Sequence, residues 1–396
     1  MPINSKTGLR ELSSIRRIDS LRPIEGADLI EVASVDGWDI VVKKGQFNVG
    51  DECIYFEIDS LLPDNQPLFE FLRPRDFRVK TIKLRGQISQ GLVFPLNDIL
   101  TLVKFPSFAW LRIRFPKLGR LFESFVNWDK ELNVTKYGLR SRKNRGFTQK
   151  EDLRGVFPEF IRKTDQERIQ NLKRELSDKV FVGSTFEVTE KLEGISTTYY
   201  LSPFEKDGYD KNEKGASNFT KEEIEKLPYY YGFASRNYDL KKGFNSSQET
   251  TGIKLNLESK LRQIQSDTGM FLALQGELVG VGIQKNYYNL DGIDWYCFDI
   301  LDCKTRKYLN PEQRRKICEK YGIPQVPLLE FVVIDESLNN VEYFVKNADG
   351  KSRLNLNNNR EGLVFKSLKN PDVHTFKAIS NNYLLKNDNE ESGDDE

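Results

Sequence analysis

Short runs of β-branched and aromatic residues, separated by glycine and asparagine turns, constrain the fold of this chain most strongly. In the first hundred residues such runs occur at 38–42 and 53–58, with Gly45 and Gly50 between them. Strands of this length with closely spaced turns are typical of a small barrel. We therefore predict a β-barrel within residues 1–100.

Strands and helices mix in the second half of the chain without a regular strand-helix-strand repeat. Pro311 opens a helix that Gly322 ends, because proline suits the first helical turn and glycine the residue after the last. A second helix is expected after a capping box at 164–167. Strand runs with interspersed helices indicate an α+β fold. The predicted strands are 184–189, 195–201, 270–278, 294–301, 328–334 and 361–367.

Charge is balanced over the whole chain, with 60 basic and 59 acidic residues, but it is unevenly distributed. Residues 101–150 are basic and rich in aromatic residues, a combination that suits stacking on bases and contact with phosphates. A buried helix or hairpin with a basic outer face is the equally weighted alternative. Residues 387–396 are acidic and contain no apolar side chain, which predicts a disordered tail.

The chain's scarcity of histidine limits the chemistry that it can perform. His374 is the single histidine, which argues against histidine-based zinc sites and against Ser-His or Cys-His catalysis. The four cysteines lack CxxC spacing, which argues against structural zinc. No apolar run is long enough for a bilayer, and the first residues lack an apolar leader. We therefore expect a cytoplasmic protein without a membrane partner, whose chemistry rests on lysine, arginine and carboxylates.

A lysine at the end of one predicted strand, followed by a glycine before the next, is the most informative pattern for chemistry. Lys191 ends the alternating run 186–191, and Gly194 precedes the run 195–200. Glycine permits a tight turn and a close approach of the backbone to a ligand. The same spacing occurs at 143–146, but in a polar, arginine-rich loop. Strand context therefore favours Lys191 as the functional lysine.

Six short motifs in a fixed order give this part of the chain its resemblance to the covalent nucleotidyltransferases, which include ATP-dependent ligases and mRNA capping enzymes. Each motif is weak alone, but each lies on a predicted strand or loop and all six follow the required order. The motifs are Lys-Leu-Glu-Gly at 191–194, Ser-Arg-Asn at 235–237, the run 275–284, Phe-Asp-Ile at 298–300, the run 360–366 and Phe-Lys-Ala-Ile-Ser at 376–380.

The sequence most closely resembles RNA ligases that carry an OB-like domain before the transferase domain and no domain after it. Segments 158–172 and 377–385 also look like that group. Residues 24–51 loosely resemble an OB-type tRNA-binding module. The domains expected from this resemblance are an OB-like nucleic-acid-binding barrel at 1–100, a basic connector at 101–150, a nucleotidyltransferase domain of antiparallel sheets with flanking helices at 151–386, and the acidic tail at 387–396.

The resemblance implies a three-step reaction with ATP as the AMP donor. Lys191 forms lysyl-AMP, AMP moves to a 5′-phosphate of RNA, and a 3′-hydroxyl then displaces AMP. Mg²⁺ or Mn²⁺ is expected at Glu361 with Glu193 assisting, because Mg²⁺ is held by few carboxylates and keeps much of its water. The implied catalytic residues are Lys191, Lys366, Lys377 and Glu361, and the implied nucleotide-binding residues are Glu190, Lys191, Gly194, Arg236, Glu277, Phe298, Glu361, Lys366 and Lys377.

These residues have distinct expected roles. Glu277 would accept hydrogen bonds from ribose hydroxyls, and Phe298 would stack on the base, with Tyr296 on the same strand face. Arg236 would contact ribose or the RNA terminus. A lysine has an unperturbed pKa of about 10.4. A metal on the α-phosphate, together with Lys366 and Lys377, is therefore expected to lower the pKa of the nucleophile and neutralise phosphate charge.

The sequence departs from the family pattern in two places. Glu193 stands where related ligases often have aspartate, and Thr375 stands where they often have a second lysine before Lys377. Lys366 or His374 is the expected substitute for that lysine in contacting phosphate.

Alternatives remain open at this point. A DNA ligase or a GTP-using capping enzyme shares the motifs, but both normally carry an OB domain after the last motif. A non-catalytic RNA-binding protein is the alternative from another class. We expect an RNA ligase, favoured as a monomer, that acts on RNA or an RNA-containing duplex with nicked ends.

Overall fold

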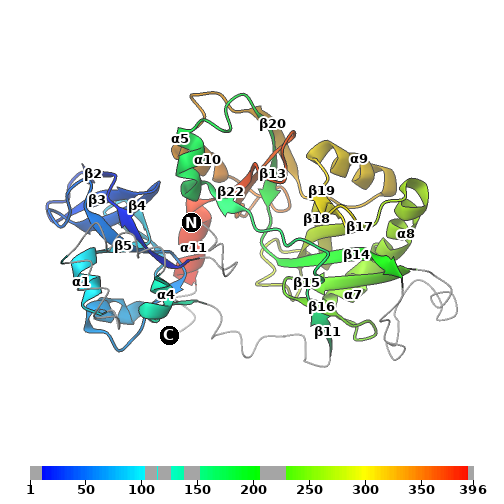
Figure 1. Ribbon diagram of the computed structural model, residues 1–396, viewed down its shortest axis with the longest axis horizontal. Helices are drawn as coiled ribbons and strands as arrows, with labels where there is room; N and C mark the ends of the chain where they lie inside the picture. Colours follow the sequence, from blue (N-terminus) through cyan, green and yellow to red (C-terminus); the bar gives the residue numbers. More distant parts are fainter. Residues whose placement is uncertain (1–10, 103–113, 115–125, 138–151, 206–228, 391–396) are drawn as a thin grey trace. The chain divides into compact units, whose positions relative to one another are not determined.

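The computed structural model divides the chain into two compact units (Figure 1). The first comprises Met1–Arg145, Arg168–Arg174 and Leu384–Glu396, and the second comprises Gly146–Glu167 and Glu175–Tyr383. Most of the basic connector and of the acidic tail lies outside the described residues, so the predicted domain boundaries stay predictions. The structure describes residues 11–102, 114, 126–137, 152–205 and 229–390.

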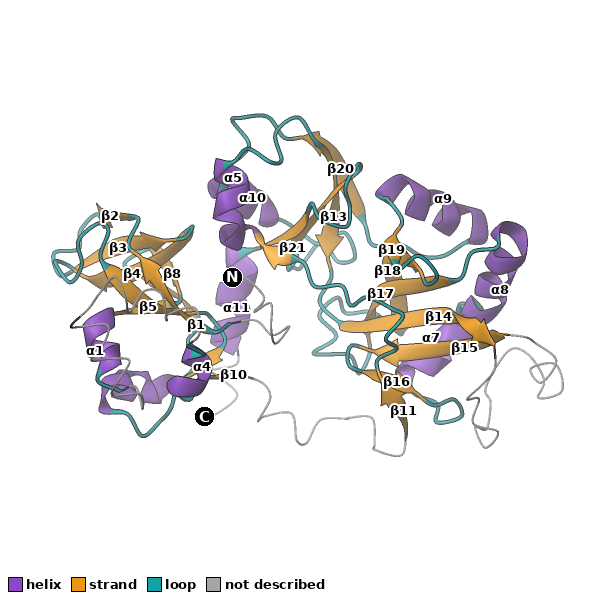
Figure 2. Cartoon of the chain, in the orientation of Figure 1, coloured by secondary structure: helices purple, strands orange, loops and turns teal. Residues whose placement is uncertain are grey.

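The first unit is built from short antiparallel strands (Figure 2). Its sheets have the strand orders β1-β5-β9, β2-β3-β4, β7-β8 and β10-β6. Among its described residues, short helical segments complete it: η1 (Pro67–Arg75), α1 (Leu96–Leu100), α4 (Trp128–Glu131) and η4 (Ile169–Leu172). The strands are β1 (Ser13–Arg17), β2 (Ser20–Pro23), β3 (Ile30–Val35), β4 (Trp38–Lys43), β5 (Glu52–Phe56), β6 (Ser60–Leu61), β7 (Thr81–Leu84), β8 (Gln87–Gln90), β9 (Leu92–Pro95) and β10 (Thr135–Lys136).

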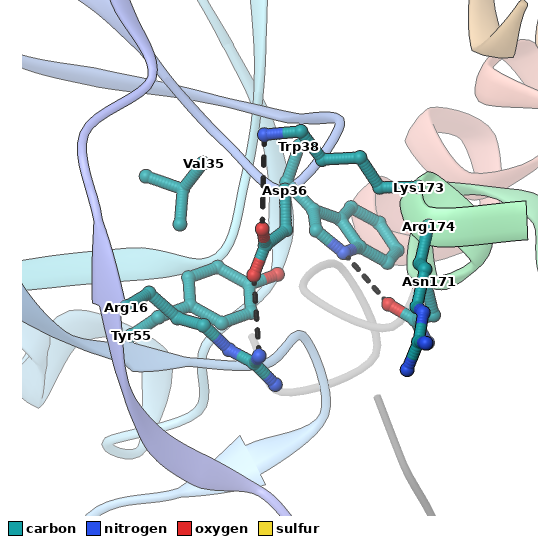
Figure 3. A pocket seen from close by; sticks show the side chains of 8 residues that line it. All are labelled: Arg16, Val35, Asp36, Trp38, Tyr55, Asn171, Lys173 and Arg174. Carbon is teal, nitrogen blue, oxygen red and sulfur yellow. Dashed lines mark hydrogen bonds and ion pairs between the residues drawn. The ribbon is translucent and has the colours of Figure 1, made fainter. Parts of the chain in front are cut away.

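Strand β5 separates the two cores of this unit. Successive side chains of a strand point to opposite faces. Ile54 and Phe56 therefore enter one core, whereas Cys53 and Tyr55 enter the other. In the second core Tyr55 stacks against Trp38, whose indole nitrogen donates a hydrogen bond of 3.0 Å to the side chain of Asn171 (Figure 3).

The second unit contains a seven-stranded and a five-stranded sheet, with all the registered strand pairs antiparallel. The seven-stranded order is β11-β16-β15-β14-β17-β18-β19, and the five-stranded order is β12-β22-β21-β13-β20. The strands are β11 (Leu153–Val156), β12 (Glu167–Arg168), β13 (Thr185–Lys191), β14 (Ile195–Glu205), β15 (Tyr229–Ser235), β16 (Tyr238–Leu240), β17 (Leu272–Gly280), β18 (Ile293–Asp302), β19 (Lys307–Tyr308), β20 (Leu328–Val333), β21 (Gly362–Ser367) and β22 (Thr375–Ile379).

Helices cover these sheets through apolar faces. In α8 (Leu257–Thr268), buried Leu257, Leu261 and Ile264 recur at the spacing of one helical face and join the core of the seven-stranded sheet. No helix among the described residues is long and apolar enough to cross a membrane. The remaining helices of the described residues are α5 (Lys173–Ser177), α7 (Ser247–Lys254), α9 (Pro311–Tyr321), α10 (Val341–Ala348) and α11 (Asn381–Glu390).

The predicted α+β class is confirmed, and the six predicted strands correspond to β13, β14, β17, β18, β20 and β21. Helix α9 begins at a capping box formed by Asn310 and Gln313 and ends at Gly322 in the left-handed conformation, as predicted. A helical stretch follows 164–167 as predicted, first as η4 (Ile169–Leu172) and then as α5 (Lys173–Ser177), but its predicted start at a capping box is wrong. Thr164 instead hydrogen-bonds to the side chain of Gln275, and the α-helix of this region begins only at Lys173.

All four cysteines lie in the described part of the chain, and all are buried and without a disulfide. Burial raises the pKa of Cys53 to about 12, with nearby Asp36 adding to the effect. Burial also raises the pKa of Cys297 and Cys303 above the usual range of a thiol.

Candidate active site

The side chain of Lys191 is held by Glu361 in the second unit. Strand β13 ends at Lys191 and pairs with β21, with Lys191 opposite Gly362. This register places Glu361, the residue before Gly362, beside the lysine. The Nζ of Lys191 donates hydrogen bonds of 2.6 Å to both carboxylate oxygens of Glu361. The strand pairing thus brings together the two residues with the most specific predicted roles.

Gly194 connects the two sheets at this point. It lies between β13 of the five-stranded sheet and β14 of the seven-stranded sheet. A Cβ atom on Gly194 would lie 2.2 Å from the carbonyl oxygen of Leu278 and 2.9 Å from the Cγ atom of Glu277. The spacing from Lys191 to Gly194 therefore reflects a close backbone approach, which brings β17 and its Glu277 near the lysine.

Carboxylates dominate the electrostatics around Lys191. Burial by itself would lower the pKa of Lys191, but Glu361 and then Glu277 outweigh it and raise the pKa. Burial raises the pKa of Glu277 to about 8, although Lys191 opposes this effect. Burial, and then the charge of Glu361, raises the pKa of Glu193 to about 7. These neighbours shift the Lys191 pKa upward, and the lowering expected from a metal on the α-phosphate with Lys366 and Lys377 stays a prediction.

The acidic residues fit a divalent cation that is shared with a ligand. Among the described residues, no group of three or more metal-ligating side chains is assembled. One carboxylate oxygen of Glu193, Oε2, is nevertheless buried without a hydrogen-bond partner in this part of the chain. Mg²⁺ is commonly held by one or two carboxylates together with substrate phosphates and water. Glu193 and Glu361 match that donor set.

Two aromatic residues of β18 lie on the predicted face. Tyr296 and Phe298 are partly buried and pack against one apolar cluster, which contains Leu192, Val279 and Tyr288. Tyr288 also accepts a hydrogen bond of 2.6 Å from the backbone nitrogen of Glu193. The same aromatic cluster therefore supports the loop that follows Lys191, and stacking of a base on Phe298 stays a prediction.

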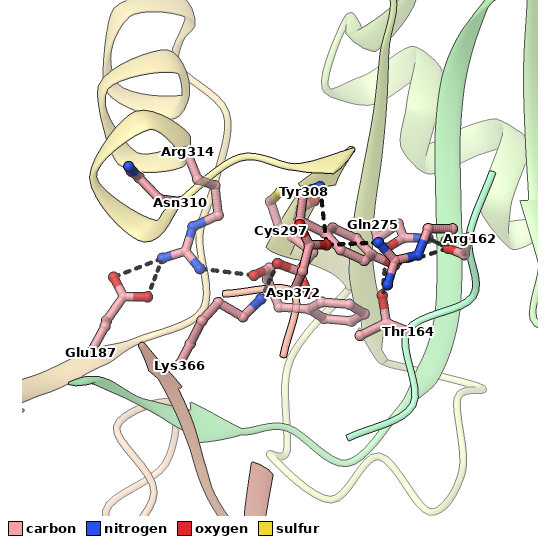
Figure 4. Close-up of polar contacts among 12 residues, drawn as sticks. Arg162, Thr164, Glu187, Gln275, Cys297, Tyr308, Asn310, Arg314, Lys366 and Asp372 are labelled. Atoms are coloured by element: carbon pink, nitrogen blue, oxygen red, sulfur yellow. Dashed lines mark hydrogen bonds and ion pairs between the residues drawn. The ribbon is translucent and has the colours of Figure 1, made fainter. Parts of the chain in front are cut away.

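Lys366 is brought to a different partner from the one expected. Its ammonium forms a buried ion pair with Asp299, which joins β21 to β18. Close by, the Nη2 of Arg314 donates to both carboxylate oxygens of Glu187 at 2.9 Å each (Figure 4). Sequence reasoning missed Asp299 as a site residue, although it is the middle residue of the Phe-Asp-Ile motif.

Arg236 and Lys377 converge on one carboxylate that sequence reasoning also missed. Asp165 lies 3.3 Å from the Nη2 of Arg236 and 3.6 Å from the Nζ of Lys377. The Asp165 side chain is 48% exposed, so solvent reaches this point. Two cations on one exposed carboxylate form a site that another anion can enter. Asp165 belongs to segment 158–172, whose family resemblance was its only signal.

Two further residues that were expected at the nucleotide site, Glu190 and His374, have their described contacts with other parts of the second unit. Glu190 follows the strand alternation away from Lys191, and its carboxylate accepts a hydrogen bond of 2.7 Å from the backbone nitrogen of Arg353. Burial raises the pKa of Glu190. The ring of His374 packs edge-on against Phe181, with ring centroids 5.8 Å apart. A phosphate contact of His374 therefore stays a prediction.

Known proteins and protein families are similar to nearly the whole length of this chain. The RNA ligase family matches residues 184–379, and an OB-fold domain matches residues 12–96. A variant of Naegleria gruberi RNA ligase solved with ATP and Mn is 32% identical, with a TM-score of 0.73, over 96% of this chain and 100% of that one. This chain belongs to the RNA ligase family. The prediction of an RNA ligase with an N-terminal OB-fold domain is confirmed.

Two further matches resemble this chain over different lengths. Naegleria gruberi RNA ligase solved with pyrophosphate is 33% identical, with a TM-score of 0.74, over 96% of this chain and 100% of that one. An uncharacterised protein of Methanocaldococcus jannaschii is 33% identical over 107 residues, which cover 25% of each chain. Membership of the family favours RNA ligation over the DNA ligase, capping-enzyme and non-catalytic alternatives.

Proposed function

We propose that this ATP-dependent RNA ligase joins a 5′-phosphate to an RNA 3′-hydroxyl at a nick in an RNA-containing duplex. The single observation that carries the proposal is the pairing of Lys191 with Glu361 at the junction of the two sheets, at 2.6 Å. Lys191 is partly buried and its pKa depends on this one close carboxylate, so a change at Glu361 would change the protonation state of the nucleophile.

Lys191 carries AMP between two phosphoryl transfers. The Nζ lone pair attacks the α-phosphorus of ATP, the bond to pyrophosphate breaks, and lysyl-AMP forms. An oxygen of the RNA 5′-phosphate then attacks the same phosphorus and breaks the phosphorus–nitrogen bond. Finally, the 3′-hydroxyl attacks the 5′-phosphorus, AMP leaves, and the new phosphodiester bond is complete. Each step transfers a phosphoryl centre, so the same positioning and electrostatic groups serve all three.

The lysine must lose its proton before it attacks. Glu361 raises the pKa of Lys191 in the ligand-free protein. If Glu361 held a divalent cation, Lys191 would lose its nearest carboxylate partner, and the burial of its amine would then favour the neutral form. A cation held by Glu361 and Glu193 would supply Lewis-acid polarisation of phosphoryl oxygens. Mg²⁺ or Mn²⁺ is proposed, and the relatives solved with ATP and Mn or AMP and Mn support this.

The remaining site residues hold the nucleotide in this proposal. Arg236 and Lys377 would exchange Asp165 for phosphate oxygens, because charge-assisted hydrogen bonds to phosphate are strong. Glu277 would bind ribose hydroxyls, and Phe298 would stack on adenine. Lys366 would act through Asp299, with which it is paired, and so position β18 and its Phe298.

The deciding experiment is the intact mass of the protein after incubation with Mg²⁺ and either ATP or GTP. The protein is first treated with pyrophosphate, which reverses any lysyl-AMP already present. We expect a gain of one AMP with ATP only, and none in Lys191→Met. Lys254→Met is the matched control, because Lys254 is an exposed lysine paired with Asp294. A GMP adduct, or an AMP adduct that survives in Lys191→Met, would overturn the proposal.

Substrate choice needs a second measurement. Sealing is compared on nicked duplexes whose 3′-hydroxyl strand ends in RNA or in DNA, with all other strands unchanged. We expect faster sealing of the RNA-ended nick. Equal rates on both substrates would contradict the RNA 3′-hydroxyl requirement and leave lysyl-AMP formation unaffected.

A further inference from the structure

A cationic pocket of about 170 Å³ lies in the first unit and has no part in the chemistry above. We propose that it binds a phosphodiester group of the RNA backbone. This inference rests on the proposed function only in taking RNA as the substrate. The pocket is lined by Arg16, Val35, Asp36, Trp38, Tyr55, Asn171, Lys173 and Arg174 (Figure 3).

The pocket is preformed because its two walls are joined by a directed contact. One wall comes from the barrel strands, and the other from segment Arg168–Arg174 of the same unit. The indole nitrogen of Trp38 donates a hydrogen bond of 3.0 Å to Asn171. The guanidinium of Arg168 lies 5.6 Å from the centre of the Trp38 ring. These contacts fix the backbone that carries the cations Lys173 and Arg174.

The lining has an excess of positive charge. Three lining residues are cationic and one is a carboxylate, Asp36, which leaves two positive charges. Asp36 lies 3.2 Å from Arg16 and 3.9 Å from Lys173. Asp19 also holds Lys173 at 2.5 Å, so counting it still leaves one positive charge. A concave site with a net positive charge beside apolar walls concentrates the field on an approaching anion.

The shape of the pocket favours a phosphate over a stacked base. Trp38 and Tyr55 are only 2% and 1% exposed, so their ring faces are not available to a nucleobase. The groups that offer hydrogen bonds to a ligand are guanidinium and ammonium ions, which bind phosphate oxygens. The unit that carries the pocket is an OB-fold domain of an RNA ligase, whose substrate is a polyanion.

The experiment measures how the full-length protein binds a nicked RNA duplex that lacks the 5′-phosphate, over a range of salt concentrations. Arg16→Gln and Arg174→Gln should each weaken binding about tenfold and reduce the salt slope by about one. Arg17→Gln is the matched control. Arg17 is the strand neighbour of Arg16, is more than half exposed, pairs with Glu52 and does not line the pocket. It should bind RNA like the wild type.

A variant that is expected to raise RNA affinity distinguishes a role of these residues in RNA binding from a role in holding the fold. Asp36→Asn removes the lining carboxylate, and asparagine tolerates the left-handed φ of 47° at this position. It should therefore tighten RNA binding several-fold. Loss of RNA affinity in Asp36→Asn as well as in the arginine variants would show that the ion pairs only hold the fold, and would overturn the proposal.

Two further readouts complete the test. Inorganic phosphate is titrated as a competitor, and lysyl-AMP formation is measured on each variant. Phosphate binding that depends on Arg16, combined with unchanged RNA affinity in both arginine variants, would assign the pocket to a free anion and overturn the proposal. A wild type that binds RNA through the pocket but forms no lysyl-AMP would contradict the proposed function alone.

Discussion

Asp165 is the one carboxylate that both Arg236 and Lys377 contact among the described residues, at 3.3 and 3.6 Å. Exposed ion pairs of this kind contribute little to stability. They instead lower the affinity of the two cations for any other anion that competes with Asp165. In the proposed reaction that anion is a phosphate of ATP, so Asp165 reduces the affinity of the site for its own substrate.

Asp165→Asn should lower the KM for ATP in lysyl-AMP formation by up to about fivefold, because the competing charge is removed while the side-chain shape is kept. The measurement is the initial rate of lysyl-AMP formation over a range of ATP concentrations. Asp267→Asn is the control, because Asp267 is also an exposed partner of a lysine, Lys320. A raised KM in Asp165→Asn would show that this carboxylate assists nucleotide binding.

The sequence predicts single residues well where strand register decides their neighbours. Lys191, Glu361 and Glu277 come together because antiparallel pairing of β13 with β21 and of β14 with β17 brings their strand positions together. The partners Asp299 and Asp165 were missed. Their contacts with Lys366 and Lys377 join segments far apart in the sequence, and no local pattern records such a pairing.

At the scale of the elements, close packing between β17 and β18 shapes the part of the site where we propose that the nucleotide binds. Gly276 lies one residue before Glu277, and the register of the two strands shifts between Gln275 and Gly276. A Cβ atom on Gly276 would lie 2.3 Å from the Cε2 atom of Trp295. Trp295 is fully buried and donates a hydrogen bond to the carbonyl of Thr197, so its ring has little room to move.

Gly276→Ala should therefore lower the free energy of unfolding by about 2 kcal/mol, the usual cost of overpacking a core. Urea denaturation followed by tryptophan fluorescence measures this change. Gly155→Ala is the matched control on β11, where an added Cβ atom meets nothing within 4 Å. The packing argument would be wrong if both variants changed stability equally.

Because of Asp239, the stability of the second unit should depend on pH. The Asp239 carboxylate accepts a hydrogen bond of 2.8 Å from the hydroxyl of Tyr200 and lies 3.2 Å from Arg154. Burial nevertheless raises the pKa of Asp239 from 3.8 to about 6. The native state therefore binds this proton more tightly than the unfolded state. The stabilisation is complete below about pH 4 and is lost as the pH rises through 6.

In Asp239→Asn this pH-dependent contribution disappears, while an oxygen remains to accept from Tyr200. The stability of the variant relative to the wild type should rise by up to about 3 kcal/mol between pH 4 and pH 7. Urea denaturation of both proteins at several pH values gives the difference directly. A difference that stays constant over this range would contradict the raised pKa of Asp239.

Local signals explain which elements the sequence predicts correctly. Helix α9 carries its own start and stop signals in Asn310, Pro311 and Gly322, so its prediction needed no tertiary information. The capping box at 164–167 has the same local signal but is overridden. Its Thr164 hydroxyl contacts Gln275 and Tyr308 on the seven-stranded sheet, and these contacts hold the segment in a non-helical conformation.

At the scale of the whole molecule, the sequence predicts the fold class and the protein family correctly. It does not predict which segments belong to each compact unit. The sequence predicts an OB-like barrel before a transferase domain, and the OB-fold and RNA ligase matches confirm that order. It does not predict that Arg168–Arg174 joins the first unit. This segment lies within the predicted transferase domain in the sequence but packs with the first unit. Only contacts between residues far apart in the sequence reveal this packing.

The distribution of the buried cysteines gives each unit its own chemical reporter. Cys53 is the one cysteine of the first unit, whereas Cys297, Cys303 and Cys318 all belong to the second. A thiol reagent can reach such side chains only when the surrounding structure opens. In partial denaturant, a mass increase of one label would mark opening of the first unit, and an increase of three would mark the second. The unmodified chain can thus report, by mass alone, whether its two halves unfold together or separately.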